Sequence, residues 1–342
     1  MKKNTYMKKK LTLLFLTLTI FCFSEEKQSC RQTCNYQNRS SSIRPLTYSK
    51  PIYPKKYFTE LNYLLMNFFE DGIEYAEIVN DGSKKFRNEQ KFNPGLRITF
   101  GFSLSKTSLA EKYLDLTWTY IKMKRGSDTN VRGTIYNLFL PPNFLNSIRA
   151  SASLSGDFNT LDFNISKPYH VSKYYISKPS IGIRGALINQ KYKIAYDIAN
   201  TITTLRAKND YLGVGLKAGY SADFIITSNY SFYAKTNFAL LYGRIDLSQK
   251  SPGEVSAFTR YTIKEKTYRV QPNSEIAFGL SFDRSFKNTI NKLSIKVGYE
   301  FLHFWDQIQL KRFMDEDPTA VKTVSRNNLK FNGLVFSLSF DI

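Results

Sequence analysis

Side chains that could carry out catalysis are few in this chain. Histidine occurs twice in 342 residues, as His170 and His303, although general acid–base and nucleophilic catalysis commonly depend on a histidine beside a nucleophile or a second acid. His303 is followed closely by Trp305 and Asp306, whereas His170 falls in a predicted turn. The sequence contains no GxSxG, HExxH or P-loop motif. We therefore expect neither an enzyme nor a bound cofactor.

Two of the three cysteines, Cys30 and Cys34, form a C-x3-C pair in a polar N-terminal stretch. In an exported protein this pair meets an oxidising compartment. The two cysteines are disulfide candidates, bonded either to each other or to neighbouring envelope proteins; alternatively, the stretch is a tether without structural consequence. A zinc site would need a second cysteine or histidine pair nearby, and none follows. We expect no metal site.

Charged side chains recur at alternate positions within otherwise apolar segments. In GLRITFGF, residues 95–102, the large apolar side chains occupy one face of an extended chain and Arg97 the other, since successive side chains of a strand point to opposite faces. The same pattern predicts twelve lumen-lining residues: Glu60, Arg97, Asp115, Asp162, Arg184, Lys217, Asp223, Lys235, Glu275, Asp283, Lys296 and Glu300. Such mixed charges predict either a weakly selective passage or a ladder of salt bridges that plugs a narrow barrel.

The segments that carry these charges read as strands with one apolar face. The end of the chain, LVFSLSFDI over residues 334–342, alternates large apolar residues with small or polar ones. The apolar faces carry no charge over their central spans, as lipid exposure requires. Short connections fall near residues 106, 170, 228 and 287, and longer ones cover 70–88, 124–147, 189–207, 246–270 and 307–327. This is typical of a transmembrane, antiparallel, up-and-down β-barrel with periplasmic N- and C-termini.

The alternation defines ten strands clearly. Two further hairpins are expected within residues 190–203 and 257–271, so about twelve strands are predicted, within a range of ten to fourteen. Three lysines followed by the apolar run of residues 11–23 predict a secretory signal peptide at 1–24. Residues 25–56 read as a flexible periplasmic extension and residues 57–342 as the barrel.

The formal net charge of +21 does not arise from the predicted lumen, where acids outnumber bases. The positive charge lies mainly in the N-terminal segment and the loops, so it does not predict an anion-selective pore. A basic chain often binds nucleic acid, but an exported one meets anionic lipid or polysaccharide instead. We therefore expect outer membrane lipid and lipopolysaccharide as partners, and no nucleic acid.

Several stretches, in this order, resemble the MOMP-like (major outer membrane protein-like) barrels of legionellae and environmental chlamydiae. They are FFEDGIEYA, FNPGLRITFGF, YLDLTWTYI, LDFNISKPY, KPSIGIRGALINQKY, DYLGVGLKAGYSADF, ALLYGRI and KVGYEF, and the likeness runs from Tyr57 to Ile342. The resemblance implies a cell outer membrane location and a porin for passive diffusion of small hydrophilic solutes. The alternative is a structural or adhesive barrel with a plugged lumen, acting through its loops and N-terminal cysteines.

Partners follow from the same resemblance. A C-terminal strand of this kind is expected to engage the barrel assembly machinery, although this chain ends in Ile342 where the family usually has an aromatic residue. A homotrimer is expected by analogy with porins, and Cys30 and Cys34 are expected to allow disulfide cross-links to envelope proteins.

Overall fold

A computed structural model describes residues 57–78, 84–86, 91–104, 112–140, 146–198, 200–251, 260–285, 292–313 and 322–341. The predicted signal peptide, the predicted extension of residues 25–56, and with them Cys30 and Cys34, lie outside the described residues. The first described residue, Tyr57, is also the first residue of the first strand. Among the described residues, no helix is long and apolar enough to cross a membrane.

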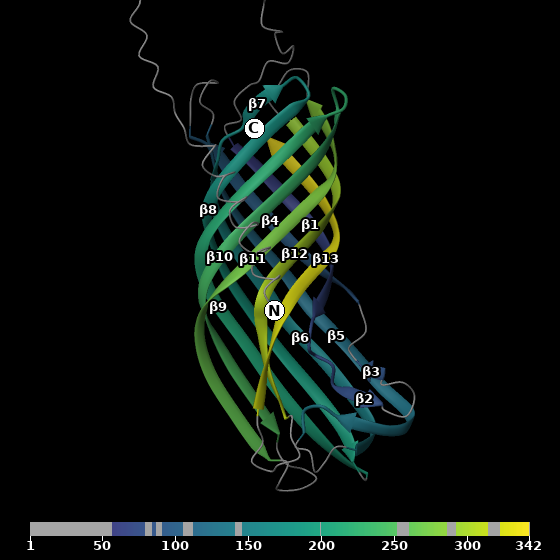
Figure 1. The fold of residues 1–342 in the computed structure, drawn as a ribbon. Coiled ribbons are helices and arrows are strands. Elements are labelled where there is room, and N and C mark those ends of the chain that lie inside the picture. The colour runs from purple at the N-terminus through teal and green to yellow at the C-terminus, as the bar shows by residue number, and fades with distance from the viewer. Residues whose placement is uncertain are drawn as a thin grey trace, which may run out of the picture. The chain divides into compact units, whose positions relative to one another are not determined.

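Ten long strands build the barrel (Figure 1). They are β1 (Tyr57–Glu70), β4 (Phe92–Ser103), β5 (Tyr113–Asn137), β6 (Asn146–Ser166), β8 (Tyr175–Ile198), β9 (Thr201–Ile225), β10 (Tyr230–Ser251), β11 (Tyr261–Ser285), β12 (Lys292–Phe313) and β13 (Lys322–Asp341). Three short strands lie outside this ring: β2 (Ala76–Ile78) and β3 (Lys84–Phe86) extend from β5, and β7 (Tyr169–Ser172) pairs with β8.

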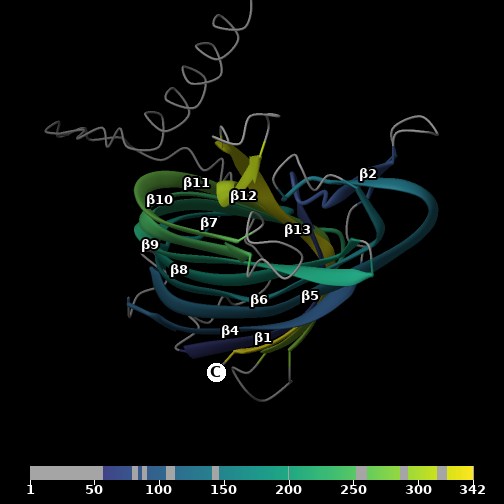
Figure 2. The same cartoon turned by 90° about the horizontal axis from the view of Figure 1, so that it is seen from below.

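Pairing of the first and last strands closes the sheet. β1 and β13 are antiparallel over thirteen residue pairs, from Phe58 opposite Asp341 to Glu70 opposite Leu329. The remaining neighbours follow chain order, and β5 pairs with both β4 and β6. Every barrel strand therefore has two partners, which removes the exposed edges of an open sheet. Figure 2 shows the strands end-on, around a common interior.

The described residues form ten barrel strands, which is the lower limit of the predicted range, so the preferred count of twelve is wrong. The two expected hairpins belong to longer strands: residues 190–203 are the junction of β8 and β9, and residues 261–271 form the first part of one strand, β11. Most of the predicted long loops are likewise strand, since β5 continues to Asn137 and β10 to Ser251. The pattern of these segments did not predict membrane strands, because their apolar residues face the barrel interior and their polar residues face outward.

That exchange divides the barrel into two halves. We call the end that carries β7 and the hairpin of residues 226–229 the turn end, and the barrel half next to it the belt half. In the belt half the outer face is apolar, and exposed residues on β9 include Leu212, Val214 and Leu216. Along β9 this face runs from Leu212 to Phe224, which corresponds to ~30 Å of height at a strand tilt of ~40°. The hydrocarbon core of a bilayer is also ~30 Å thick.

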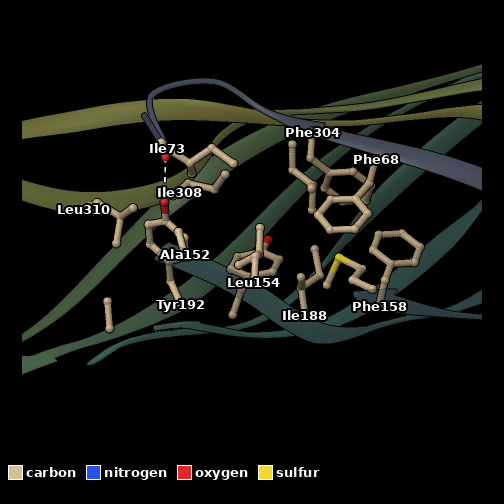
Figure 3. Close-up of a cluster of buried hydrophobic side chains, with 14 of the residues drawn as sticks. Phe68, Ile73, Ala152, Leu154, Phe158, Ile188, Tyr192, Phe304, Ile308 and Leu310 are labelled. Atoms are coloured by element: carbon tan, nitrogen blue, oxygen red, sulfur yellow. Dashed lines mark hydrogen bonds between the residues drawn. The ribbon is translucent and has the colours of Figure 1, made fainter. Parts of the chain in front are cut away.

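In the other half, which we call the distal half, the apolar side chains point inward. Phe68, Phe158, Ile188, Leu241 and Phe304 are fully buried within one cluster. The outward positions there carry lysine, serine and aspartate, and belong to a surface suited to water. The distal half is therefore built like a soluble β-barrel whose interior is a packed apolar core (Figure 3).

Two short segments also fold into the distal interior. After β1, Ile73 and Tyr75 are buried, and their carbonyl oxygens accept hydrogen bonds of 2.6 Å from the hydroxyls of Tyr192 and Tyr196. Figure 3 shows Ile73 turned toward Tyr192. After β5, Phe139 is buried and its ring stands edge-on to Tyr192 at 6.1 Å. Both segments add buried side chains to the apolar core of the distal half.

Candidate functional site

Seven charged residues meet inside the belt half, and each comes from a different strand. We call them the lumen cluster: Arg97 from β4, Asp162 from β6, Arg184 from β8, Lys217 from β9, Lys235 from β10, Glu275 from β11 and Glu300 from β12. Along each tilted strand, successive side chains point alternately into and out of the barrel. One inward residue from each of seven strands is therefore enough to form the cluster.

Arg97 forms a two-pronged contact with Glu300. Its two terminal nitrogens donate hydrogen bonds of 2.7 and 2.6 Å to the two carboxylate oxygens, and its Nε donates to Thr119 at 3.0 Å. The same guanidinium lies 3.9 Å from Glu275. Planar, bidentate pairing of this kind is the strongest geometry available to an arginine and a carboxylate.

Arg184 joins the opposite side of the cluster. It donates to both carboxylate oxygens of Asp162 at 2.7 Å and to Glu275 at 2.9 Å. Lys217 donates to Asp162 at 2.7 Å, and Lys235 lies 3.0 Å from Glu275. Glu275 thus links the Arg97 side of the lumen to the Arg184 side, and the contacts run without interruption across the barrel.

The lumen cluster is shielded from water except at one point. Six of its seven side chains have exposures of 9% or less, and Lys235 is 35% exposed. Four bases face three acids, so the cluster is close to neutral. Buried charges are stable only when each has a partner with good geometry. This arrangement joins strands across the lumen.

A small polar cavity of ≈ 220 Å³ lies against the cluster. Ten of the twelve predicted lumen residues line it: Glu60, Arg97, Asp115, Asp162, Lys217, Asp223, Lys235, Glu275, Lys296 and Glu300. Arg184 is not among the lining residues, because it is buried within the cluster. Asp283 pairs instead with Lys292 at 2.7 Å near the turn end. Lys296 pairs with Glu60 at 3.1 Å.

Sequence reasoning missed the apolar layer that follows the cluster toward the distal half. The ring of Phe158 packs against Phe331 at 4.9 Å and Phe304 at 5.4 Å between centroids. Phe68 and Phe331 pack at 6.2 Å. The sequence of β5 contains the change from polar to apolar inward residues, because inward Thr117 and Thr119 are followed by buried Ile121 and Met123. A pattern search that expects apolar residues only on the lipid-facing side does not detect this change.

No described group of histidine, cysteine, aspartate and glutamate side chains is arranged to hold a metal ion. His303 stacks on Trp305 at 4.3 Å between ring centroids, alongside the strand pair β12–β13. Asp306 adopts a left-handed φ of 51° at the irregularity that follows in β12. The pair of His303 and Asp306 noticed in the sequence thus lies at a kink in one strand.

Several solved structures are distantly similar to the chain. No curated protein matches the chain. Similar solved structures include the outer membrane protease OmpT of Escherichia coli (8% identity, 86% of this chain and 99% of that chain, TM-score 0.45). They also include the P. putida toluene transporter TodX (9%, 84% and 90%, 0.32) and a FadL homologue of Pseudomonas aeruginosa (9%, 84% and 90%, 0.24).

The family comparison is more specific. The model of the family described as "Legionella pneumophila major outer membrane protein precursor" matches residues 51–342. This range contains all ten strands, the lumen cluster and the distal core. The resemblance noted in the sequence is therefore confirmed, and an outer membrane location is supported. The chain belongs to the Legionella major outer membrane protein family.

Proposed function

We propose that this protein is a structural outer membrane barrel whose lumen is closed. Its belt half lies in the bilayer and holds the folded distal half outside it. The observation that carries the proposal is the presence of two closures in series. The lumen cluster spans the belt half, and the apolar core fills the distal half. A solute crossing the barrel would have to pass both.

The energetic cost of such a passage supports the closed form. Separating Arg184 from Asp162 and Glu275 would leave buried charges without partners, and breaking a buried pair costs about 3–5 kcal/mol. A water-filled path through the distal half would also expose Phe158, Phe304 and Phe331. The interior of a porin is polar, whereas the interior of the distal half here contains a packed cluster of apolar side chains.

We further propose that the distal half faces the outside of the cell. Outer membrane barrels have short periplasmic turns, and their longer connections face outward. In this chain the hairpin of residues 226–229 is at the turn end, whereas the strands extend past the apolar belt in the opposite direction. The surface that reaches the environment is then the outer face and the loops of the distal half.

Passive diffusion, the function expected of a porin, is the second candidate. The polar cavity of ≈ 220 Å³ and the charges around it favour it, because they provide a water-compatible space in the belt half. For solutes to cross, the distal core would have to rearrange.

Liposome swelling separates the two candidates. The full-length protein is placed in liposomes alongside a general porin as positive control, and swelling is followed in small sugars. We expect no swelling above protein-free liposomes. The Arg97→Ser/Glu300→Ser variant opens one closure only, so it is expected to remain inactive as well. Swelling by the unmodified protein at a rate near that of the porin would overturn the closed form and favour diffusion.

A further inference from the structure

The outer face of the distal half carries basic side chains in register across six adjacent strands. One line of hydrogen-bonded neighbours, which we call the first basic row, reads Lys124, Ser155, Lys191, Lys208, Ser248 and Lys264 from β5 to β11. The next line, the second basic row, reads Gly126, Ser153, Lys193, Arg206, Lys250 and Thr262. Together the rows contain seven bases and no acid.

These bases are available to a ligand. Lys124, Lys191, Lys193 and Lys264 are exposed, and their side chains form no ion pair with a described residue. Lys208 pairs with Asp210, yet 52% of its side chain is exposed. Like charges placed side by side in a sheet repel one another. A surface that keeps such an arrangement is suited to an anion that bridges several strands.

On four of its six strands the first basic row lies four residues from a large apolar or aromatic residue of the outer face. Tyr120 precedes Lys124 by four residues, and the same spacing separates Leu187 from Lys191, Leu212 from Lys208 and Tyr268 from Lys264. Four residues of strand cover ~13 Å, or ~10 Å of height at a tilt of ~40°. The headgroup layer of a bilayer leaflet is ~5–8 Å thick, and a lysine side chain can bend back toward it.

Small hydroxyl residues separate the bases and complete the surface. Ser155 lies between Lys124 and Lys191, and Ser153 lies beside Lys193. Phosphate groups accept charge-assisted hydrogen bonds from lysine and further hydrogen bonds from hydroxyl groups. Bulky side chains are absent from these intervening positions, so a glycolipid headgroup could lie flat on the sheet.

We propose that the two basic rows bind the phosphate groups of lipopolysaccharide in the outer leaflet. The inference rests on the proposed outward orientation of the distal half. One line of outer-face neighbours lies between the first basic row and the apolar belt, and it reads Lys122, Asp157, Asn189, Asp210, Asp246 and Lys266. The closeness of the basic rows to the belt favours a ligand with acyl chains and a strongly anionic headgroup over a soluble polyanion. The two basic rows and this intervening line together hold nine bases and three acids, and this positive excess complements such a headgroup.

Binding is tested with the full-length protein refolded in zwitterionic detergent and titrated with rough-type lipopolysaccharide. Lys191→Gln/Lys193→Gln is expected to weaken binding by about tenfold to thirtyfold, from roughly 1 kcal/mol per base near an anionic surface. The matched control is Lys167→Gln/Lys173→Gln, which removes two lysines near the turn end, where they lie over Tyr169 and Tyr174. The control is expected to bind as the unmodified protein does.

Further arms identify the ligand chemistry. Phosphatase-treated lipopolysaccharide is expected to bind at least tenfold more weakly, and the difference between the variants is expected to shrink with it. Equal binding by both double variants, or equal binding of treated and untreated lipopolysaccharide, would overturn the proposal. Phosphatidylglycerol binding as tight as lipopolysaccharide would overturn the assigned ligand. Because the assay uses micelles, its outcome is independent of orientation and of lumen closure, which separate measurements address.

Discussion

Arg97 and Glu300 meet inside the barrel through two parallel hydrogen bonds of 2.7 and 2.6 Å, although they are 203 residues apart in the chain. Their strands, β4 and β12, are separated in the sheet by β1 and β13. The contact therefore crosses the lumen instead of running along the wall. It also braces the seam where the first and last strands close the barrel.

Removing one partner of this contact should be costly. Glu300→Gln is expected to lower the free energy of unfolding by about 3–5 kcal/mol, because the buried positive charge of Arg97 would lose its bidentate carboxylate partner. The double variant Arg97→Gln/Glu300→Gln should lose less than the sum of the two single variants. Denaturant unfolding in micelles, followed by tryptophan fluorescence, measures both. Additive losses would show that the two side chains do not interact.

Phe158 and Phe163 test the exchange of faces on a single strand, β6. Phe158 is fully buried in the distal core, whereas Phe163 is 42% exposed on the apolar belt. Phe158→Ala is expected to cost about 3–5 kcal/mol, as large core truncations do. Phe163→Ala should cost much less in the same unfolding assay, because it leaves no internal cavity. A reversed order of the two losses would contradict the assignment of inside and outside.

The outer face should respond to charge according to height. Leu216 is 71% exposed in the middle of the belt on β9, and an arginine at the bilayer midplane costs about 2–4 kcal/mol. Leu216→Arg should therefore reduce stability in lipid vesicles by that amount. Ser248→Arg, on the outer face of the distal half, should be close to neutral. Equal effects of the two substitutions would place the membrane elsewhere on the barrel.

Cysteine labelling on intact cells tests the orientation. In a background with the native cysteines replaced by serine, Thr201→Cys, exposed at the distal end where β9 begins, should react with a membrane-impermeant maleimide. Thr227→Cys, exposed in the hairpin at the turn end, should react only after the outer membrane is permeabilised. Labelling of Thr227→Cys alone on intact cells would reverse the orientation and place the distal half in the periplasm.

Much of the belt half could be predicted from the sequence, because lipid outside and polar groups inside impose a strict alternation. Residues 95–102 and 334–341 illustrate this, since both are strands with the expected inward and outward sets. The predicted charged residues also lie inside the barrel, and ten of them line one cavity. Alternation fixes the face of a side chain, but not its partner across the lumen.

The distal half escaped prediction for a physical reason. Beyond the bilayer the outer solvent is water, so the apolar residues move to the other face while the strand continues. On β8, outward Ile183 and Leu187 give way to outward Lys191 and Lys193, and inward Ile188 and Ile194 become the buried residues. A pattern that changes phase within one strand resembles two separate elements, which led to the expectation of extra hairpins. The inward turns at Ile73 and Phe139 depend on tertiary packing, and no local pattern announced them.

The central claim is that the lumen is closed, and single-channel recording in planar bilayers tests it most directly. With the full-length, refolded protein, we predict no conductance steps above the baseline of the protein-free membrane. Arg184→Ser, which opens the lumen cluster but leaves the distal core in place, is predicted to give none either. Regular, reproducible steps from the unmodified protein would contradict a closed lumen and would identify the barrel as a diffusion pore.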